Sequence, residues 1–351
     1  MQIKDIITSA IKEVASSQER FQLGDVLKVL DGQRVSRQYV SRIVAEEVTM
    51  KRLISSGSTR YTYYALPENI DSIREKHSWE FQNNNLREYE LYQDTVVATT
   101  PFLQTMPENT ESILGYAFSE MLNNAIDHSK SEKISTTFYH EDGSVTFILR
   151  DQGIGVFESI RAKYKLKDAL EAIQELLKGK TTTAPQMHSG EGIFFTSKIA
   201  DRFVLDSHEM RLIIDNTIKD IFVESRPRAL TGTKVTFTIK EKTKKHLSDI
   251  FREYQSNQEA MDFDRTVVHV KLYTMGTVYV SRSQARRILA GLAKKFKLVV
   301  MDFDKVPTIG QAFADEVFRV FTAAHPDVKI EAIHANEAVN FMINRAINTK
   351  R

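Results

Sequence analysis

The chain has 351 residues, of which 42% are hydrophobic and 27% are charged, as in ordinary folded proteins of two or three domains. Its formal net charge is only +2, so any attraction to nucleic acid must come from local basic patches. It has no cysteine, which excludes disulfides, thiolate zinc sites and thiol catalysis. Because the sequence shows neither a membrane-length apolar run nor a signal-peptide core, we expect a cytoplasmic protein that makes no membrane contact.

Residues 1–66 are predicted to form a small helical domain. The spacing of apolar residues predicts helices over 1–16 and 23–30, and Ser36 is placed to cap a third helix. The turn Ser55-Ser-Gly-Ser58, followed by β-branched and aromatic residues, predicts a hairpin. Three helices and a hairpin resemble a winged helix-turn-helix domain, which implies binding of double-stranded DNA.

Such a domain would meet DNA through the start of its third helix and through the hairpin. The candidate DNA-binding residues are Arg34, Ser36, Arg37, Gln38, Lys51, Arg52 and Arg60. The alternative is a winged domain used for protein contact or dimerisation, whose charges are only solvated. Residues 67–99 are interpreted as a connector, with a polar helix predicted from Ile70 to Tyr92.

The segment Phe118–His128 predicts a helix that carries polar residues on one side. Glu120, Asn124 and His128 recur every four residues and therefore share that side. A carboxylate can orient or deprotonate a water, and an Asn oxygen is a hard ligand suited to Mg²⁺. The alternative is a half-exposed helix whose polar face simply meets solvent.

Three further segments follow in order. Asp151-Gln-Gly-Ile-Gly155 stands at the end of a predicted strand, where a carboxylate could accept from an adenine amine. A polar stretch predicted to be a mobile lid, residues 178–192, ends in Gly190 and Gly192 before a helix whose first amides suit phosphate. Last, Thr231-Gly-Thr233 precedes an alternating strand.

The order of these four segments resembles the GHKL ATPases, which include gyrase B subunits, heat-shock chaperones, mismatch-repair ATPases, histidine kinases and anti-sigma-factor serine kinases. The first segment, Glu-x-x-x-Asn-Ala-x-x-His, is most similar to the anti-sigma kinase branch. The resemblance covers residues 100–240 and implies an α/β sandwich that binds ATP and Mg²⁺.

Carried over by position, the resemblance implies that Glu120 is catalytic, handling the water or acceptor proton, and that Asn124 ligates Mg²⁺. The implied nucleotide-binding residues are Asn124, His128, Asp151, Gly153, Gly155, Lys180, Gly190, Gly192 and Thr233. Lys178, Lys180 and His188 are candidates for the terminal phosphate. Glu191 departs from the pattern, since its charge between the two glycines would weaken ATP affinity or point to solvent.

Residues 260–351 alternate predicted strands with predicted helices, which indicates an α/β domain. The strands are predicted over 267–272, 277–280, 298–303 and 328–333. The segments Met301-Asp-Phe303 and Phe313-Ala-Asp-Glu316 resemble a STAS-like domain, a relative of anti-sigma-factor antagonists. In that family the segment before the second motif is serine-rich, whereas here Thr308 is its only hydroxyl, which argues against a fused kinase and substrate.

The sequence therefore predicts a multidomain α+β protein with a winged helix, a GHKL ATP-binding module and a STAS-like domain. One hypothesis is a regulator in which Mg-ATP binding or slow hydrolysis gates binding of DNA or of a partner. The alternative is a serine/threonine kinase of the anti-sigma type that acts on a STAS-like partner. The STAS-like domain could also mediate self-association.

Overall fold

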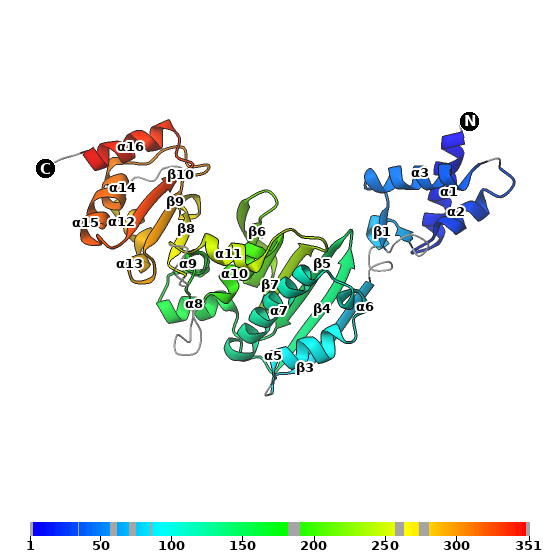
Figure 1. The fold of residues 1–351 in the computed structure, drawn as a ribbon, viewed down its shortest axis with the longest axis horizontal. Helices are drawn as coiled ribbons and strands as arrows, with labels where there is room; N and C mark the ends of the chain where they lie inside the picture. Colours follow the sequence, from blue (N-terminus) through cyan, green and yellow to red (C-terminus); the bar gives the residue numbers. More distant parts are fainter. Residues whose placement is uncertain are drawn as a thin grey trace.

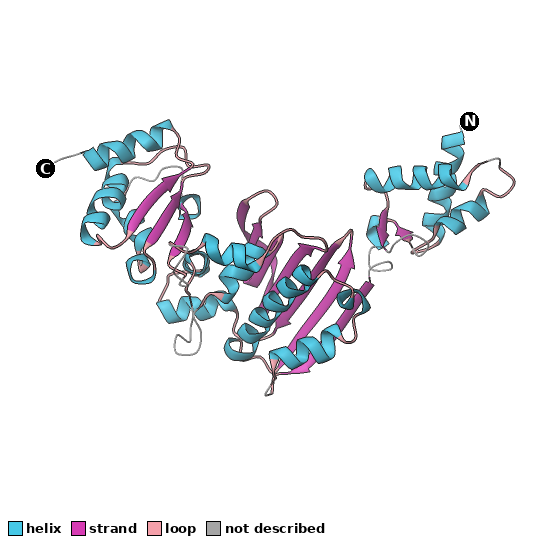
Figure 2. Cartoon of the chain, viewed as in Figure 1, coloured by secondary structure: helices cyan, strands magenta, loops and turns pink. Residues whose placement is uncertain are grey.

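A computed structural model describes residues 3–33, 35–56, 62–69, 75–84, 86–181, 190–256, 263–273 and 281–348. Within these residues, separate hydrophobic clusters lie in the N-terminal part, in a central five-stranded sheet domain, and in the C-terminal part (Figures 1 and 2). Among the helices described, none combines the length and the apolar character needed to cross a bilayer.

The N-terminal part contains the three predicted helices and the two strands of the predicted hairpin. The helices are α1 (Ile3–Ser17), α2 (Leu23–Val29) and α3 (Arg37–Thr49), and β1 (Ile54–Ser56) pairs antiparallel with β2 (Tyr63–Ala65). Ser36 caps α3 as predicted, its Oγ accepting from the Tyr39 N–H at 3.2 Å. Ile7, Val26 and Val40 are fully buried between the helices.

The connector differs from its prediction. After a short 3₁₀ turn (η2, Pro67–Asn69), residues 75–82 form strand β3 (Glu75–Gln82), so the helix predicted over 70–92 is wrong there. The segment alternates half-buried His77, Trp79 and Phe81 with exposed polar residues, which is the period of a strand. Helix α5 (Glu88–Glu90) and a π-helix (η3, Leu91–Val97) follow, and the π-helix buries Leu91, Tyr92 and Val96 in the central core.

The central sheet has the order β3-β4-β5-β7-β6, and all of its pairs are antiparallel. Its other strands are β4 (Lys133–Glu141), β5 (Ser144–Asp151), β6 (Arg202–Asp215) and β7 (Asp220–Lys240). Helix α7 (Glu108–His128) covers one face, with α6 (Pro101–Gln104) and α5 beside it (Figure 1). The Phe118 ring meets Phe147 edge-on at 5.5 Å, which fixes α7 against the sheet.

Three helices complete the central domain: α8 (Val156–Tyr164), α9 (Ala169–Lys178) and α10 (Gly192–Ile199). Helix α8 ends at its C-cap Lys165, whose φ of 53° lies in the left-handed region that commonly ends a helix, and α9 starts after its cap Asp168.

The C-terminal part contains a parallel three-stranded sheet in the order β10-β9-β8, with strands β8 (Arg265–His269), β9 (Leu298–Asp302) and β10 (Lys329–Ile333). The strand predicted over 277–280 lies outside the described residues. The remaining elements are α11 (Leu247–Glu253), η4 (Val270–Tyr273), α12 (Arg282–Leu289), α13 (Leu292–Lys295), α14 (Gln311–Asp315), η5 (Glu316–Phe321), α15 (Thr322–Ala324) and α16 (Glu337–Asn348).

The C-terminal part packs on the central domain through α10. Phe194 and Phe195 of this helix belong to the C-terminal hydrophobic cluster. Their rings lie 4.8 and 4.9 Å from the ring of Phe263. Because α10 also lines the cavity described next, the two parts of the chain share one element.

Candidate functional site

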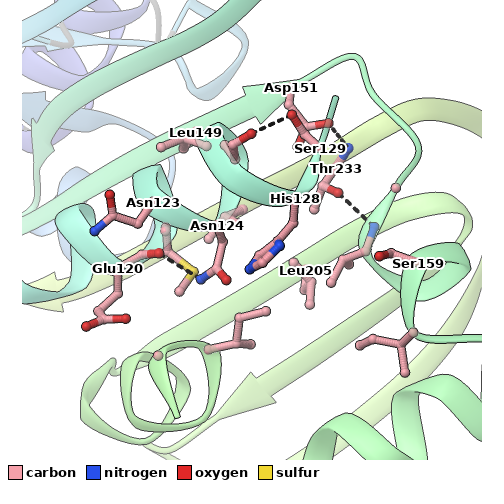
Figure 3. Close-up of a pocket in the computed structure, with 18 of the residues that line it drawn as sticks. Glu120, Asn123, Asn124, His128, Ser129, Leu149, Asp151, Ser159, Leu205 and Thr233 are labelled. Carbon is pink, nitrogen blue, oxygen red and sulfur yellow. Dashed lines mark hydrogen bonds between the residues drawn. The ribbon is translucent and has the colours of Figure 1, made fainter. Parts of the chain in front are cut away.

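A cavity of about 300 Å³ lies between α7, the strand ends of the central sheet, α8 and the start of α10. It brings together residues that are far apart in the sequence, from Glu120 to Thr233 (Figure 3). The predicted residues that line it are Glu120, Asn124, His128, Asp151, Gly155, Gly190, Gly192 and Thr233. The volume is within the range of small-molecule sites.

Helix α7 supplies the polar wall of the cavity, as its four-residue spacing predicted. Glu120, Asn124 and His128 all face the cavity from this one helix (Figure 3). The Asn124 side-chain amide donates to the Glu120 backbone carbonyl at 2.7 Å. That bond orients the amide so that its oxygen can coordinate a cation. Amide oxygens are hard donors of the kind that Mg²⁺ prefers.

Asp151 ends β5 and is only 3% exposed. Its Oδ1 accepts from the Gly153 N–H at 2.9 Å and from the Thr233 N–H at 3.2 Å. Burial raises the pKa of this carboxyl above its ordinary value, against the opposing effect of those hydrogen bonds. Both backbone N–H groups donate to Oδ1. The carboxylate can therefore accept a further hydrogen bond from a donor in the cavity.

Two glycines allow backbone to approach these side chains closely. A Cβ on Gly153 would lie 1.8 Å from the Ser129 carbonyl oxygen, so only glycine fits between β5 and the end of α7. A Cβ on Gly192 would lie 2.1 Å from Oε2 of Glu120. The first turn of α10 therefore rests directly against the Glu120 carboxylate.

The phosphate side predicted from the sequence is the segment that leads into α10. Gly190 and Gly192 line the cavity, and the Gly190 carbonyl accepts from the Thr181 N–H at 3.1 Å. Burial, reinforced by the charges of Glu120 and Glu191, raises the pKa of Tyr116. Both carboxylates therefore act on the Tyr116 hydroxyl.

Three predicted residues do not line the cavity, and one more lies outside the described residues. Gly153 packs against the Ser129 backbone, and the Lys180 ammonium lies over the rings of Phe263 and Phe296 at 5.4 and 5.7 Å. Lys178, also suggested for phosphate, is buried and donates to Glu175 at 2.9 Å and to the Ala290 carbonyl at 3.1 Å. His188 is the residue outside the described part.

The cavity also contains polar residues that the sequence analysis missed. Asn123, Ser129, Ser159 and Thr181 line it as well. Asn123 and Ser129 belong to the same helical segment as Asn124, so their position on α7 was the available signal. Nothing in the local sequence marks Ser159, because α8 reaches the cavity only through the tertiary fold.

The candidate DNA-binding residues differ in their exposure and in the contacts of their side chains. Arg37 and Gln38 are exposed in the first turn of α3, and Lys51 is exposed after its end. Arg52 holds the carboxylate of Glu47 through two hydrogen bonds of 2.7 Å. Ser36 caps α3, while Arg34 and Arg60 lie outside the described residues.

The antiparallel sheet backed by α7, with a buried carboxylate at a strand end and a glycine-led helix across the cavity, defines a GHKL-type nucleotide-binding module. Residues 109–243 match the family of histidine kinase-, DNA gyrase B- and HSP90-like ATPases. Residues 284–340 match a STAS-like domain of unknown function. A search of curated proteins found no match to the chain.

The chain therefore contains a GHKL-type ATPase domain and a STAS-like domain, and the first of these implies ATP binding. The donor set agrees with that ligand, since the buried Asp151 carboxylate suits an amine and the Asn124 amide oxygen suits a hard cation.

Proposed function

We propose that the chain is an ATP-dependent regulator, in which Mg-ATP binding or slow hydrolysis in the α7 cavity gates binding of DNA or of a protein partner. The observation that carries this proposal is the cavity itself. It joins Glu120, Asn124, Asp151 and Gly192 in one place and shares α10 with the C-terminal domain.

Each cavity residue has a role suited to its chemistry. Asp151 would accept a hydrogen bond from the exocyclic amine of adenine, and Thr233 would lie beside the base. Asn124 would offer its amide oxygen to Mg²⁺, and Glu120 would orient or deprotonate the attacking water. Bound Mg-ATP supplies a transferable phosphoryl group whose charge the metal offsets.

The gating half of the proposal rests on contacts that flank the phosphate-side segment. Before it, the Gln174 side chain donates to the Leu272 carbonyl at 2.6 Å, and Thr266 Oγ1 donates to the Lys178 carbonyl at 2.6 Å. After it, Phe194 and Phe195 enter the C-terminal core. A movement of α9 or α10 on nucleotide binding would therefore move surfaces that the C-terminal domain contacts.

The DNA half of the proposal rests on the N-terminal part. Its three helices and hairpin resemble a winged helix, and Arg37 and Lys51 are exposed where such domains meet phosphates. A protein partner, or a second copy bound through the STAS-like domain, is the alternative output.

A second candidate function is serine or threonine phosphoryl transfer, in which Glu120 takes the proton of the acceptor hydroxyl. The presence of a STAS-like domain beside the nucleotide module favours it, because relatives of that domain accept phosphate in the anti-sigma systems. Thr308 is half-buried before α14, so a separate STAS-like protein is the better acceptor.

The deciding experiment incubates the purified full chain with γ-labelled ATP and Mg²⁺ and follows free phosphate and labelled protein. Glu120→Ala and Asp151→Ala are compared with Glu108→Ala, which changes an exposed carboxylate on the same helix away from the cavity. Free phosphate lost in both cavity variants supports an ATPase switch, and label on a hydroxyl supports the kinase. Absence of nucleotide binding would refute both.

A further inference from the structure

The carboxyl ends of the three parallel strands of the C-terminal sheet bring two histidines and one aspartate together. His269 ends β8, Asp302 ends β9, and His334 directly follows the last residue of β10. The strand register pairs His269 with Asp302 and Asp302 with Ile333. Ligands of open parallel sheets bind at this edge, and none of the three residues lines the α7 cavity.

Both imidazoles hydrogen-bond to the same carboxylate. His269 Nδ1 lies 2.9 Å from Oδ2 of Asp302, and His334 Nδ1 lies 2.8 Å from Oδ1. The Asp304 N–H also donates to Oδ1, at 3.0 Å. Although burial acts to raise the pKa of Asp302, these hydrogen bonds hold it well below its usual range, so the group is ionised.

The ionised carboxylate fixes the tautomer of both rings. A carboxylate only accepts hydrogen bonds, so each Nδ1 carries a hydrogen and each neutral ring has its lone pair on Nε2. The two rings differ in access, since the His269 side chain is 21% exposed and the His334 side chain 65% exposed. Burial, helped by the charges of Lys198 and Lys271, lowers the pKa of His269, which marks it as the structural member.

The backbone holds His334 in an uncommon conformation. Its φ is 52°, in the left-handed region that few residues other than glycine adopt. The Ile333 carbonyl before it accepts from the Phe303 N–H at 3.0 Å, and the Asn336 side chain after it donates to the Val306 and Pro307 carbonyls. Such strain persists where surrounding structure enforces it, and it is concentrated at functional sites.

We propose that His334 is a phosphoryl acceptor that takes the γ-phosphoryl group of ATP on Nε2. The lone pair of Nε2 forms the new bond to phosphorus, the bond from phosphorus to the β,γ-bridging oxygen breaks, and ADP leaves with that electron pair. Nε2 loses no proton, because it carries none. Asp302 offsets the positive charge that develops on the ring and can take the Nδ1 proton.

The donor is the nucleotide module of a second copy of the chain. β10, which His334 follows, and α7, which lines the ATP cavity, lie in different parts of the molecule (Figure 1), and we therefore place the donor cavity in a second copy. This inference rests on the ATP binding proposed above, which is measured separately in the test.

The test incubates the full chain with γ-labelled ATP and Mg²⁺ and measures label that survives alkali but is lost in acid, as expected for phosphohistidine. His334→Gln is expected to lose at least nine-tenths of this label. The matched control His325→Gln changes another histidine of the same domain, whose ring is tilted against Phe321 at 4.7 Å, and is expected to keep the label. ATP binding is measured in every variant.

Mixing two variants tests the donor. Asp151→Ala and His334→Gln chains of different size should each stay unlabelled alone, and the mixture should label only the Asp151→Ala chain.

ATP binding without alkali-stable label, or label that His334→Gln leaves intact, would overturn this inference while the proposed function stands. A labelled wild-type chain beside an unlabelled mixture would overturn transfer between copies. If no ATP is bound, the proposed function and this inference both fail.

Discussion

Asp151 is buried and is also placed to recognise adenine. Removing its charge should therefore weaken ATP binding without lowering the stability of the fold. Asp151→Asn keeps an oxygen for the Gly153 and Thr233 N–H groups but offers an NH₂ where the adenine amine needs an acceptor. A hydrogen bond to a charged group contributes about 1.5–3 kcal/mol, so ATP affinity should fall roughly 10- to 150-fold by calorimetric titration.

The same substitution should not lower the melting temperature at pH 7. Because burial raises the pKa of Asp151 in the folded state, its ionised form costs folding free energy above that pKa. The cost disappears below the unfolded pKa of about 4, so any gain from Asp151→Asn should shrink as the pH falls toward that value. Thermal unfolding at pH 7 and pH 4 checks this, and a large destabilisation at pH 7 would contradict it.

Gly192 is the point where the phosphate-side helix meets the proposed general base. In Gly192→Ala the new methyl group must displace the Glu120 carboxylate, since it would lie 2.1 Å from Oε2. We expect a loss of at least tenfold in ATP hydrolysis with a smaller change in stability, measured by phosphate release and thermal unfolding. Gly24→Ala in α2 is the control, because a Cβ there meets nothing within 4 Å.

Three of the predicted cavity residues follow from local geometry, whereas the others were assigned through the resemblance to the GHKL ATPases. The four-residue spacing of Glu120, Asn124 and His128 fixes them on one side of α7 wherever that helix packs. Lys180 follows the end of α9, and its ammonium lies over the rings of Phe263 and Phe296 in another part of the chain. Local pattern contains no information on that contact, so the phosphate role suggested for Lys180 lacks support in the cavity lining.

At the scale of elements, α9 connects the nucleotide module to the C-terminal domain through a buried lysine. The Lys178 ammonium is paired with Glu175 and donates to the Ala290 carbonyl, and Lys295 reaches the same glutamate at 3.0 Å. Lys178→Met would remove one of the two lysines that pair with Glu175 and the donor to the Ala290 carbonyl, so we expect a loss of about 1–3 kcal/mol in the free energy of unfolding by urea denaturation.

This substitution also separates an anchoring role from a phosphate-binding role. If Lys178 only joins the two domains, ATP affinity at a temperature where the variant is folded should change by less than about threefold. A collapse of ATP affinity without loss of stability would mean that the lysine reaches the phosphates instead. Lys163→Met, an exposed lysine on α8, is the matched control.

Helices α1, α2 and α3 and strands β5, β9 and β10 could be predicted because each has a clear pattern of apolar residues, whereas β3 could not. Its half-buried face holds only His77, Trp79 and Phe81, and the long polar run around it is equally compatible with a solvated helix. What decides the matter is pairing with β4, which supplies backbone hydrogen bonds from a segment more than fifty residues later in the chain. Such pairing is a property of the tertiary structure and leaves no mark on the local sequence.

At the scale of the whole molecule, the proposed DNA contact predicts a salt dependence. If Arg37 and Lys51 contact phosphates, changing each to alanine should lower the slope of log affinity against log salt by about 1 and weaken binding uniformly across duplex sequences. Fluorescence anisotropy with a labelled duplex measures this, with and without ATP. Lys12→Ala, an exposed lysine on α1, is expected to leave the slope unchanged.

The edge strand β3 determines where the chain can be cut to give a stable fragment. A fragment that starts at residue 100 would lack β3 and the buried Leu91, Tyr92 and Val96, and it would leave the edge of β4 without the backbone partners that β3 supplies. Exposed strand edges of this kind recruit other chains. We expect that fragment to aggregate in size-exclusion chromatography. A fragment that starts at residue 67 keeps β3, whose charged side chains protect the sheet edge, and is expected to elute as a discrete species.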